Sequence, residues 1–145
     1  MSDRPKVDKY FRPENRKEET AKVYRTESGS YRLEMCRYST TEPGSDKKTW
    51  DYSQGNVYRG DSTVPIATIN RNYGSFPFAF VEGHPNGQDY LVCGEDYQGL
   101  TVVELKTGLR RESIDKDSDK GWGFCSVDFL FNAENQVLLI RGCYW

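Results

Sequence analysis

The chain has 145 residues, a length that suits one domain of ordinary size with a buried core. Its 20 Lys and Arg residues nearly balance 22 Asp and Glu residues, and the net charge of −2 gives no global reason to bind nucleic acid or an anionic membrane. The N-terminal residues are too charged for a secretory signal, and no apolar run reaches the roughly 18 residues of a membrane span. We therefore expect a cytoplasmic protein with neither kind of partner.

The cysteines give no metal-binding pattern. No Cys-x-x-Cys pair occurs, no cysteine stands at ligand spacing from the single histidine, His84, and each lies in an apolar, strand-like stretch. We expect buried thiols outside any disulfide in a reducing compartment. No Gly-x-Ser-x-Gly, P-loop or dinucleotide motif occurs either, and the sequence predicts no cofactor. The four cysteines are Cys36, Cys93, Cys125 and Cys143.

The N-terminal part of the chain divides into a polar arm and a first, loose set of strands. Residues 1–22 are predicted to form the arm, with one short turn of helix after Pro13. From residue 23 onward strand signals dominate, and a β domain is predicted over residues 23–145. The first predicted strands cover residues 31–36, 50–52, 56–58 and 66–69, and a polar insertion separates the first two.

The clearest strand pattern spans residues 76–114. Four short segments fill this stretch, and turn residues such as Asn86-Gly87 and Gly108 separate them. The spacing leaves no room for crossover helices, so the segments predict a meander of four antiparallel strands. The predicted strands cover residues 78–82, 90–94, 100–105 and 109–114.

The same pattern begins again over residues 124–142, with two strands around a turn at residues 132–135. A shift of 48 residues aligns Val81 with Phe129, and Gly94 with Gly142. Repetition at a period in the 40s, with four strands in each repeat, is typical of β-propeller blades. The sequence therefore predicts an all-β fold of antiparallel four-stranded meanders, arranged as propeller-like blades.

Two segments carry a resemblance to known blades. The turn at residues 84–88, followed by Tyr90-Leu91-Val92, resembles the Ser-Pro-Asp-Gly turn between the first two strands of WD-repeat and related β-propeller blades. Residues 100–108 resemble their third strand and its exit turn. The Trp-Asp and Gly-His pairs of true WD repeats are absent, so no subfamily is assigned. The resemblance implies a propeller fold and no particular function, since propellers host enzymes and scaffolds alike.

The predicted blades number about three, with the last one incomplete, whereas propellers have four or more. Three explanations stay open: the chain is part of a larger protein, a second subunit completes the sheet, or the strands pack as a β-sandwich or open barrel. In the first two cases residues 136–145 form an apolar edge strand that is open to pairing. We therefore expect a protein partner or self-association through this C-terminal edge strand.

An acidic segment offers a weak candidate for calcium. Asp115, Asp117 and Asp119 stand at alternate positions, and such carboxylates can converge on one hard cation. Lys116 and Lys120 would repel that cation, and the EF-hand residues at the sixth and twelfth positions are absent. The other interpretation is a solvated acidic connection between two blades.

A propeller would gather several loops at one rim, where aromatic side chains lie beside carboxylates. Aromatic anchors dominate protein-binding surfaces, which favours a protein-interaction or scaffold module using this rim or the open edge strand. Alternatively, Phe76 and Phe124 begin buried strands, and only Tyr97 and Trp122 are exposed at the rim. The alternative function is part of a propeller-type enzyme, a hydrolase, lyase or glycan-processing enzyme, in which Glu95, Asp96 or the acidic segment supplies the carboxylate chemistry. The predicted rim residues are Tyr73, Phe76, Asp96, Tyr97, Trp122 and Phe124.

Overall fold

The computed structural model describes residues 10–17, 21–41, 49–96, 98–113 and 124–144, and nearly all regular structure within these ranges is β-strand. Every strand pair is antiparallel, so the predicted all-β class and its antiparallel four-stranded sheets are confirmed. The chain divides into two compact units, Met1–Ser75 and Phe76–Trp145. Within the described ranges, no helix is long and apolar enough to cross a membrane.

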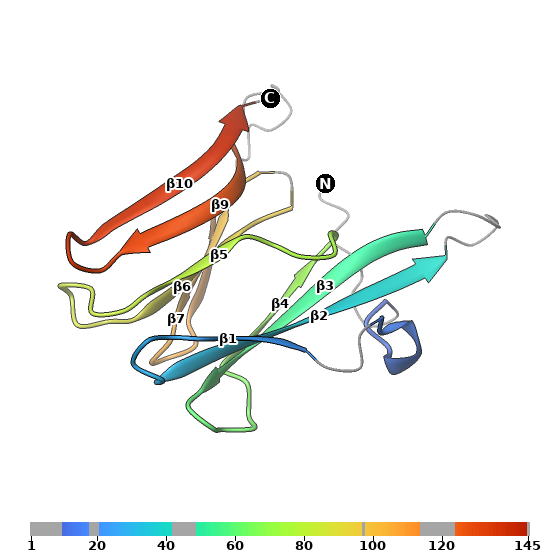
Figure 1. The fold of residues 1–145 in the computed structure, drawn as a ribbon, viewed down its shortest axis with the longest axis horizontal. Coiled ribbons are helices and arrows are strands. Elements are labelled where there is room, and N and C mark those ends of the chain that lie inside the picture. Colours follow the sequence, from blue (N-terminus) through green and yellow to red (C-terminus); the bar gives the residue numbers. More distant parts are fainter. Residues whose placement is uncertain (1–9, 18–20, 42–48, 97, 114–123, 145) are drawn as a thin grey trace. The chain divides into compact units, whose positions relative to one another are not determined.

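The first unit contains a four-stranded meander whose sheet order follows the chain (Figure 1). Its strands are β1 (Lys22–Arg25), β2 (Tyr31–Thr41), β3 (Thr49–Arg59) and β4 (Ala67–Arg71). The segments predicted separately at 50–52 and 56–58 belong to one continuous strand, because β3 pairs residue by residue with the whole of β2. The predicted turn of helix after Pro13 is a three-residue 3₁₀ turn, Pro13–Asn15.

The two faces of this sheet differ in chemistry. Leu33, Val57 and Ile69 lie on one face and are fully buried. On the other face the Arg32 guanidinium pairs with Glu34 at 3.0 Å and lies over the Tyr58 ring at 4.2 Å. Burial raises the pKa of the Tyr58 phenol, the charge of Glu34 raises it further, and Arg32 partly opposes both. One face of this sheet therefore has an apolar centre, and the other is polar and aromatic.

The segment before the 3₁₀ turn packs on the polar face. The Tyr10 ring stacks on Tyr52 with their centroids 4.6 Å apart, and Phe11 meets Tyr38 edge to face at 5.2 Å. Such offset and edge-to-face arrangements suit the ring quadrupoles and bury aromatic area. These contacts fix residues 10 and 11 against the sheet.

The second unit begins with the meander predicted over residues 76–114. Its strands lie in chain order and are β5 (Phe78–Val81), β6 (Tyr90–Gly94), β7 (Leu100–Glu104) and β8 (Arg110–Ser113). Gly87 and Gly108 have φ of 83° and 75° in the turns that follow β5 and β7, as the turn chemistry required. The predicted four-stranded meander is therefore confirmed in both order and direction.

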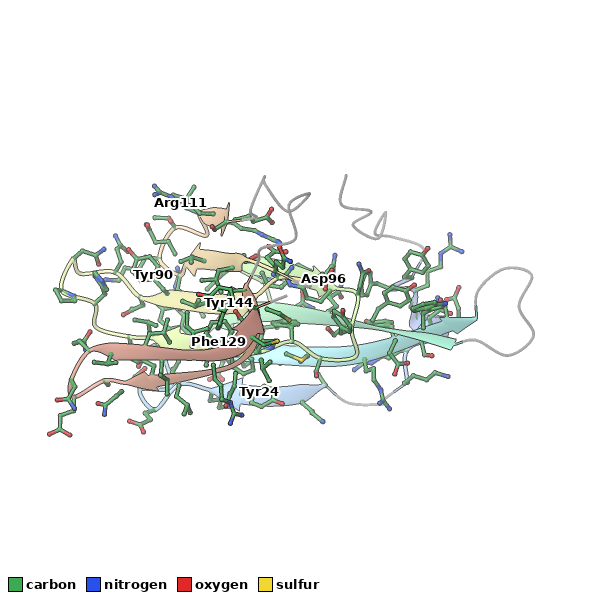
Figure 2. The ribbon with its side chains drawn as sticks, turned by 90° about the horizontal axis from the view of Figure 1, so that it is seen from above. Tyr24, Tyr90, Asp96, Arg111, Phe129 and Tyr144 are labelled. Atoms are coloured by element: carbon green, nitrogen blue, oxygen red, sulfur yellow. The ribbon has the colours of Figure 1, made fainter. Side chains whose placement is uncertain are left out.

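The last two strands, β9 (Phe124–Asn132) and β10 (Val137–Tyr144), form a hairpin that pairs with no other described strand. The inner face of the hairpin packs on the β5–β8 sheet, and Phe129, labelled in Figure 2, belongs to one buried cluster with Ala79, Val81 and Val92. Leu91, Cys93 and Val103 on the other face of the sheet are also fully buried. The second unit thus contains two β layers, and the thinner layer is a two-stranded sheet.

Candidate interaction surface on the β9–β10 hairpin

Only part of the predicted rim lies within the described residues. Tyr73 is exposed in the first unit, just after β4, whereas Phe76 is only 6 % exposed and packs edge to face on Phe78. Asp96 is partly exposed in the turn between β6 and β7, where its carbonyl accepts the Gln98 backbone N–H at 2.8 Å. The predicted residues outside the described ranges are Tyr97, Trp122, Asp115, Asp117 and Asp119.

Phe124 lies at the start of β9, and its ring meets the Tyr144 ring edge to face at 5.1 Å. The two residues are opposite each other in the hairpin register, and both belong to the second unit. Tyr144 is the more exposed of the two. The structure therefore brings Phe124 together with the end of β10 rather than with a loop.

The outer face of the hairpin is apolar and exposed. Leu130 and Leu139 lie directly opposite each other, and their side chains are 61 % and 57 % exposed. Val137 lies two residues before Leu139, and Val127 lies at the bulge of β9; these are 53 % and 58 % exposed. Clustered apolar side chains of this kind mark sites of association more often than scattered single ones do. We call these four residues the outer apolar face.

The free edge of β10 adjoins the outer apolar face. Among the described strands β10 pairs with β9 alone, so the N–H and C=O groups that point away from β9 have no strand partner there. Proteins protect such edges with lysine, proline or bulges, and between Val137 and Arg141 β10 has none of these. Its one charge, Arg141, pairs with Asp128 across the hairpin at 3.3 Å. This segment is therefore a regular, apolar, open edge.

A bulge ends the regular part of the hairpin. The register shifts between Arg141 and Gly142, so that each following residue of β10 pairs with a residue of β9 one position further along the strand. A Cβ atom on Gly142 would collide with the Cys125 carbonyl and lie 2.8 Å from the Phe124 ring. Glycine is required here because the backbone of β9 and the Phe124 ring occupy the space of a side chain.

Tyr73 lines a separate cavity within the first unit. The cavity has a volume of about 260 Å³, and its lining includes two cationic residues, Lys22 and Arg37, and two tyrosines, Tyr24 and Tyr73. No described carboxylate forms an ion pair with Lys22 or Arg37. The remaining lining residues are Met35, Gly74 and Ser75.

Among the described residues, no group of three or more His, Cys, Asp and Glu side chains could hold a metal ion. Comparisons with protein families, with curated proteins and with solved structures find no match to this chain. The candidate surface on the hairpin therefore rests on strand pairing and exposure alone.

The outer apolar face did not belong to the predicted rim, although the sequence carried a signal for it. Apolar residues stand at consecutive positions in Phe129-Leu130-Phe131 and in residues 137–140, so both faces of these strands had to be apolar. A half-buried strand with a solvated outer face would alternate instead.

Proposed function

We propose that this chain is a protein-interaction module that associates with a second copy of itself through β10. Two β10 strands would pair antiparallel, and the two hairpins would form one continuous sheet in the order β9-β10-β10-β9. The observation that carries the proposal is the open edge of β10 beside the outer apolar face.

The size of the sheet favours a second copy as the occupant. Among the described residues, the other two sheets have four strands each, whereas the hairpin has two. A two-stranded sheet is marginally stable on its own, and added strands satisfy the open edge. Two hairpins joined at β10 would make a third sheet of the same four-stranded size. A second copy would thereby supply the two strands that the last, incomplete blade of the sequence pattern lacks.

The residues of β10 are compatible with pairing to themselves. A two-fold axis at Leu139 would place the two Leu139 side chains opposite each other and Val137 opposite Arg141 of the second copy. Arg141 is the only charged residue of β10, and this register keeps the two arginines apart. A cytoplasmic location agrees with the proposal, since none of the four cysteines forms a disulfide.

Light scattering on the full chain tests the proposal. We expect a mass twice that of the 16.7 kDa chain at high concentration, and a decrease toward 16.7 kDa on dilution. A mass of 16.7 kDa at every concentration would contradict it. A mass that rises only when another protein is added would assign the edge to a different partner, and it would overturn self-association.

The cavity of the first unit supports a second candidate function, the binding of a small anion that carries an aromatic ring. Lys22 and Arg37 supply positive charge, and Tyr24 and Tyr73 supply ring surfaces on which a planar group can stack. Arginine favours phosphate and carboxylate because its donors form a planar fork. A volume of about 260 Å³ is near the lower end of the range for small-molecule sites.

Titration with phenyl phosphate checks this second candidate. Replacement of Arg37 by glutamine (Arg37→Gln) should weaken binding about tenfold or more, because a charge-assisted hydrogen bond is lost. Arg111→Gln removes an exposed arginine from the second unit and should leave the affinity unchanged. Equal affinities of the two variants, or no binding to the unaltered chain at millimolar ligand, would exclude the site.

A further inference from the structure

Two of the four cysteines lie directly opposite each other in the hairpin. Cys125 on β9 is the register partner of Cys143 on β10, and neither forms a disulfide. The other two face different residues: Cys36 is paired with Gln54, and Cys93 lies between Phe78 and Thr101. Within the ladders, Cys125 and Cys143 are therefore the one pair of thiols that the strand register brings together.

The bulge creates this juxtaposition. Before the bulge Arg141 pairs with Asp128, and after it Gly142 pairs with Ser126. An unbroken register would have placed Cys143 opposite Ser126, with Cys125 on the other face of the hairpin. Because the bulge shifts the register by one residue, both thiols point to the same face.

The strand register alone places the two residues within the range of a disulfide. Directly opposite residues of an antiparallel pair have Cα atoms about 4.5–5.5 Å apart, whether or not the pair is hydrogen-bonded. A disulfide needs a Cα separation of about 4.4–6.8 Å. Cys143 is exposed and Cys125 is partly exposed, so reagents from solvent can reach the pair. The prediction of buried thiols is therefore confirmed for Cys93 and wrong for Cys143.

We propose that Cys125 and Cys143 form a redox modification site, which small disulfides such as glutathione disulfide convert reversibly into a disulfide within one chain. The Cys143 thiolate attacks one glutathione sulfur, forms a mixed disulfide and releases one glutathione thiolate. The Cys125 thiolate then attacks the sulfur of Cys143, closes the cross-strand disulfide and releases the second glutathione. Two protein thiols are oxidised, one glutathione disulfide is reduced to two glutathione molecules, and the two protons pass through solvent to the released thiolates.

Mass spectrometry of the reduced full chain after incubation with glutathione disulfide tests this site. At concentrations where the chain is monomeric, we expect a loss of about 2 Da, because two hydrogen atoms leave, and two of the four cysteines should be alkylated once the chain is unfolded. Peptide mapping should find Cys125 joined to Cys143, and reduction should restore the original mass. Working with the monomer separates this result from the outcome for self-association.

Serine variants supply the controls. Cys125→Ser should stop at a glutathione adduct on Cys143, because the second thiol is gone, whereas Cys36→Ser should still form the internal disulfide. A glutathione adduct as the end product in the unaltered chain would overturn the proposal. A disulfide between any other two cysteines, or one that joins two chains, would overturn it as well.

Discussion

The double variant Val137→Lys with Leu139→Lys is expected to remain monomeric at concentrations where the unaltered chain is dimeric. Both side chains are exposed in the isolated chain, so the variant should fold normally. In the paired sheet, lysines at Leu139 would lie directly opposite each other, and the apolar contact would be replaced by repulsion. We expect the dissociation constant to rise at least about a hundredfold, since the loss should exceed about 2.7 kcal/mol. Light scattering measures this change.

Leu109→Lys is the matched control for this variant. Leu109 is also an exposed leucine of the second unit, at 49 %, but it lies in the turn after β7 rather than on the hairpin. The control should dimerise like the unaltered chain. If the control and the double variant weakened dimerisation equally, added charge rather than pairing through β10 would govern the association.

Replacement of Phe129 by alanine should cost about 3–5 kcal/mol of the free energy of unfolding of the second unit, because it leaves a cavity in the core. Phe129 is 5 % exposed and belongs to the buried cluster between the hairpin and the β5–β8 sheet. Urea denaturation measures the loss from the shift of the transition midpoint. The loss of stability is large because Phe129 is the buried residue through which the hairpin contacts the β5–β8 sheet.

Leu130→Ala is the control for Phe129→Ala. Leu130 is the next residue of β9, but its side chain points to the outer face and is 61 % exposed. In the monomer this substitution should change the free energy of unfolding by no more than about 0.5 kcal/mol. Similar losses for the two variants would contradict the assignment of inner and outer faces.

The second unit was predictable because its turns are specified locally. Gly87 and Gly108 supply the positive φ that the turns after β5 and β7 need, and short apolar segments lie between these turns. The first unit was less predictable. The polar run Ser53-Gln54-Gly55 interrupts the apolar pattern of β3, yet pairing with β2 and β4 on both sides keeps it in one strand.

Two glycines of the second unit lie against rings at the start of the preceding strand. A Cβ atom on Gly94, near the end of β6, would lie 2.8 Å from the ring of Pro77, just before β5. A Cβ atom on Gly142 would lie equally close to the ring of Phe124, at the start of β9. At Gly94 the Pro77 ring occupies the space of a side chain, whereas at Gly142 the Cys125 carbonyl and the Phe124 ring both occupy it.

The candidate surface was only partly predictable. The apolar composition of residues 136–145 indicated an edge strand, and β10 is one of the two edge strands of a two-stranded sheet. The pairing of Cys125 with Cys143 could not be predicted, because it depends on a bulge that shifts the register by one residue. Hairpin periodicity alone places the two thiols on opposite faces.

Amide hydrogen exchange along β10, measured residue by residue at low and high protein concentration, tests self-pairing most directly. Alternate N–H groups of an antiparallel strand point to its two neighbours, so one set in β10 pairs with β9 and the other points to the open edge. We predict that the edge-facing set exchanges rapidly in dilute solution and becomes protected when the concentration rises. If that set exchanged rapidly at every concentration, the pairing of two β10 strands would be contradicted, even for a chain that dimerises by another surface.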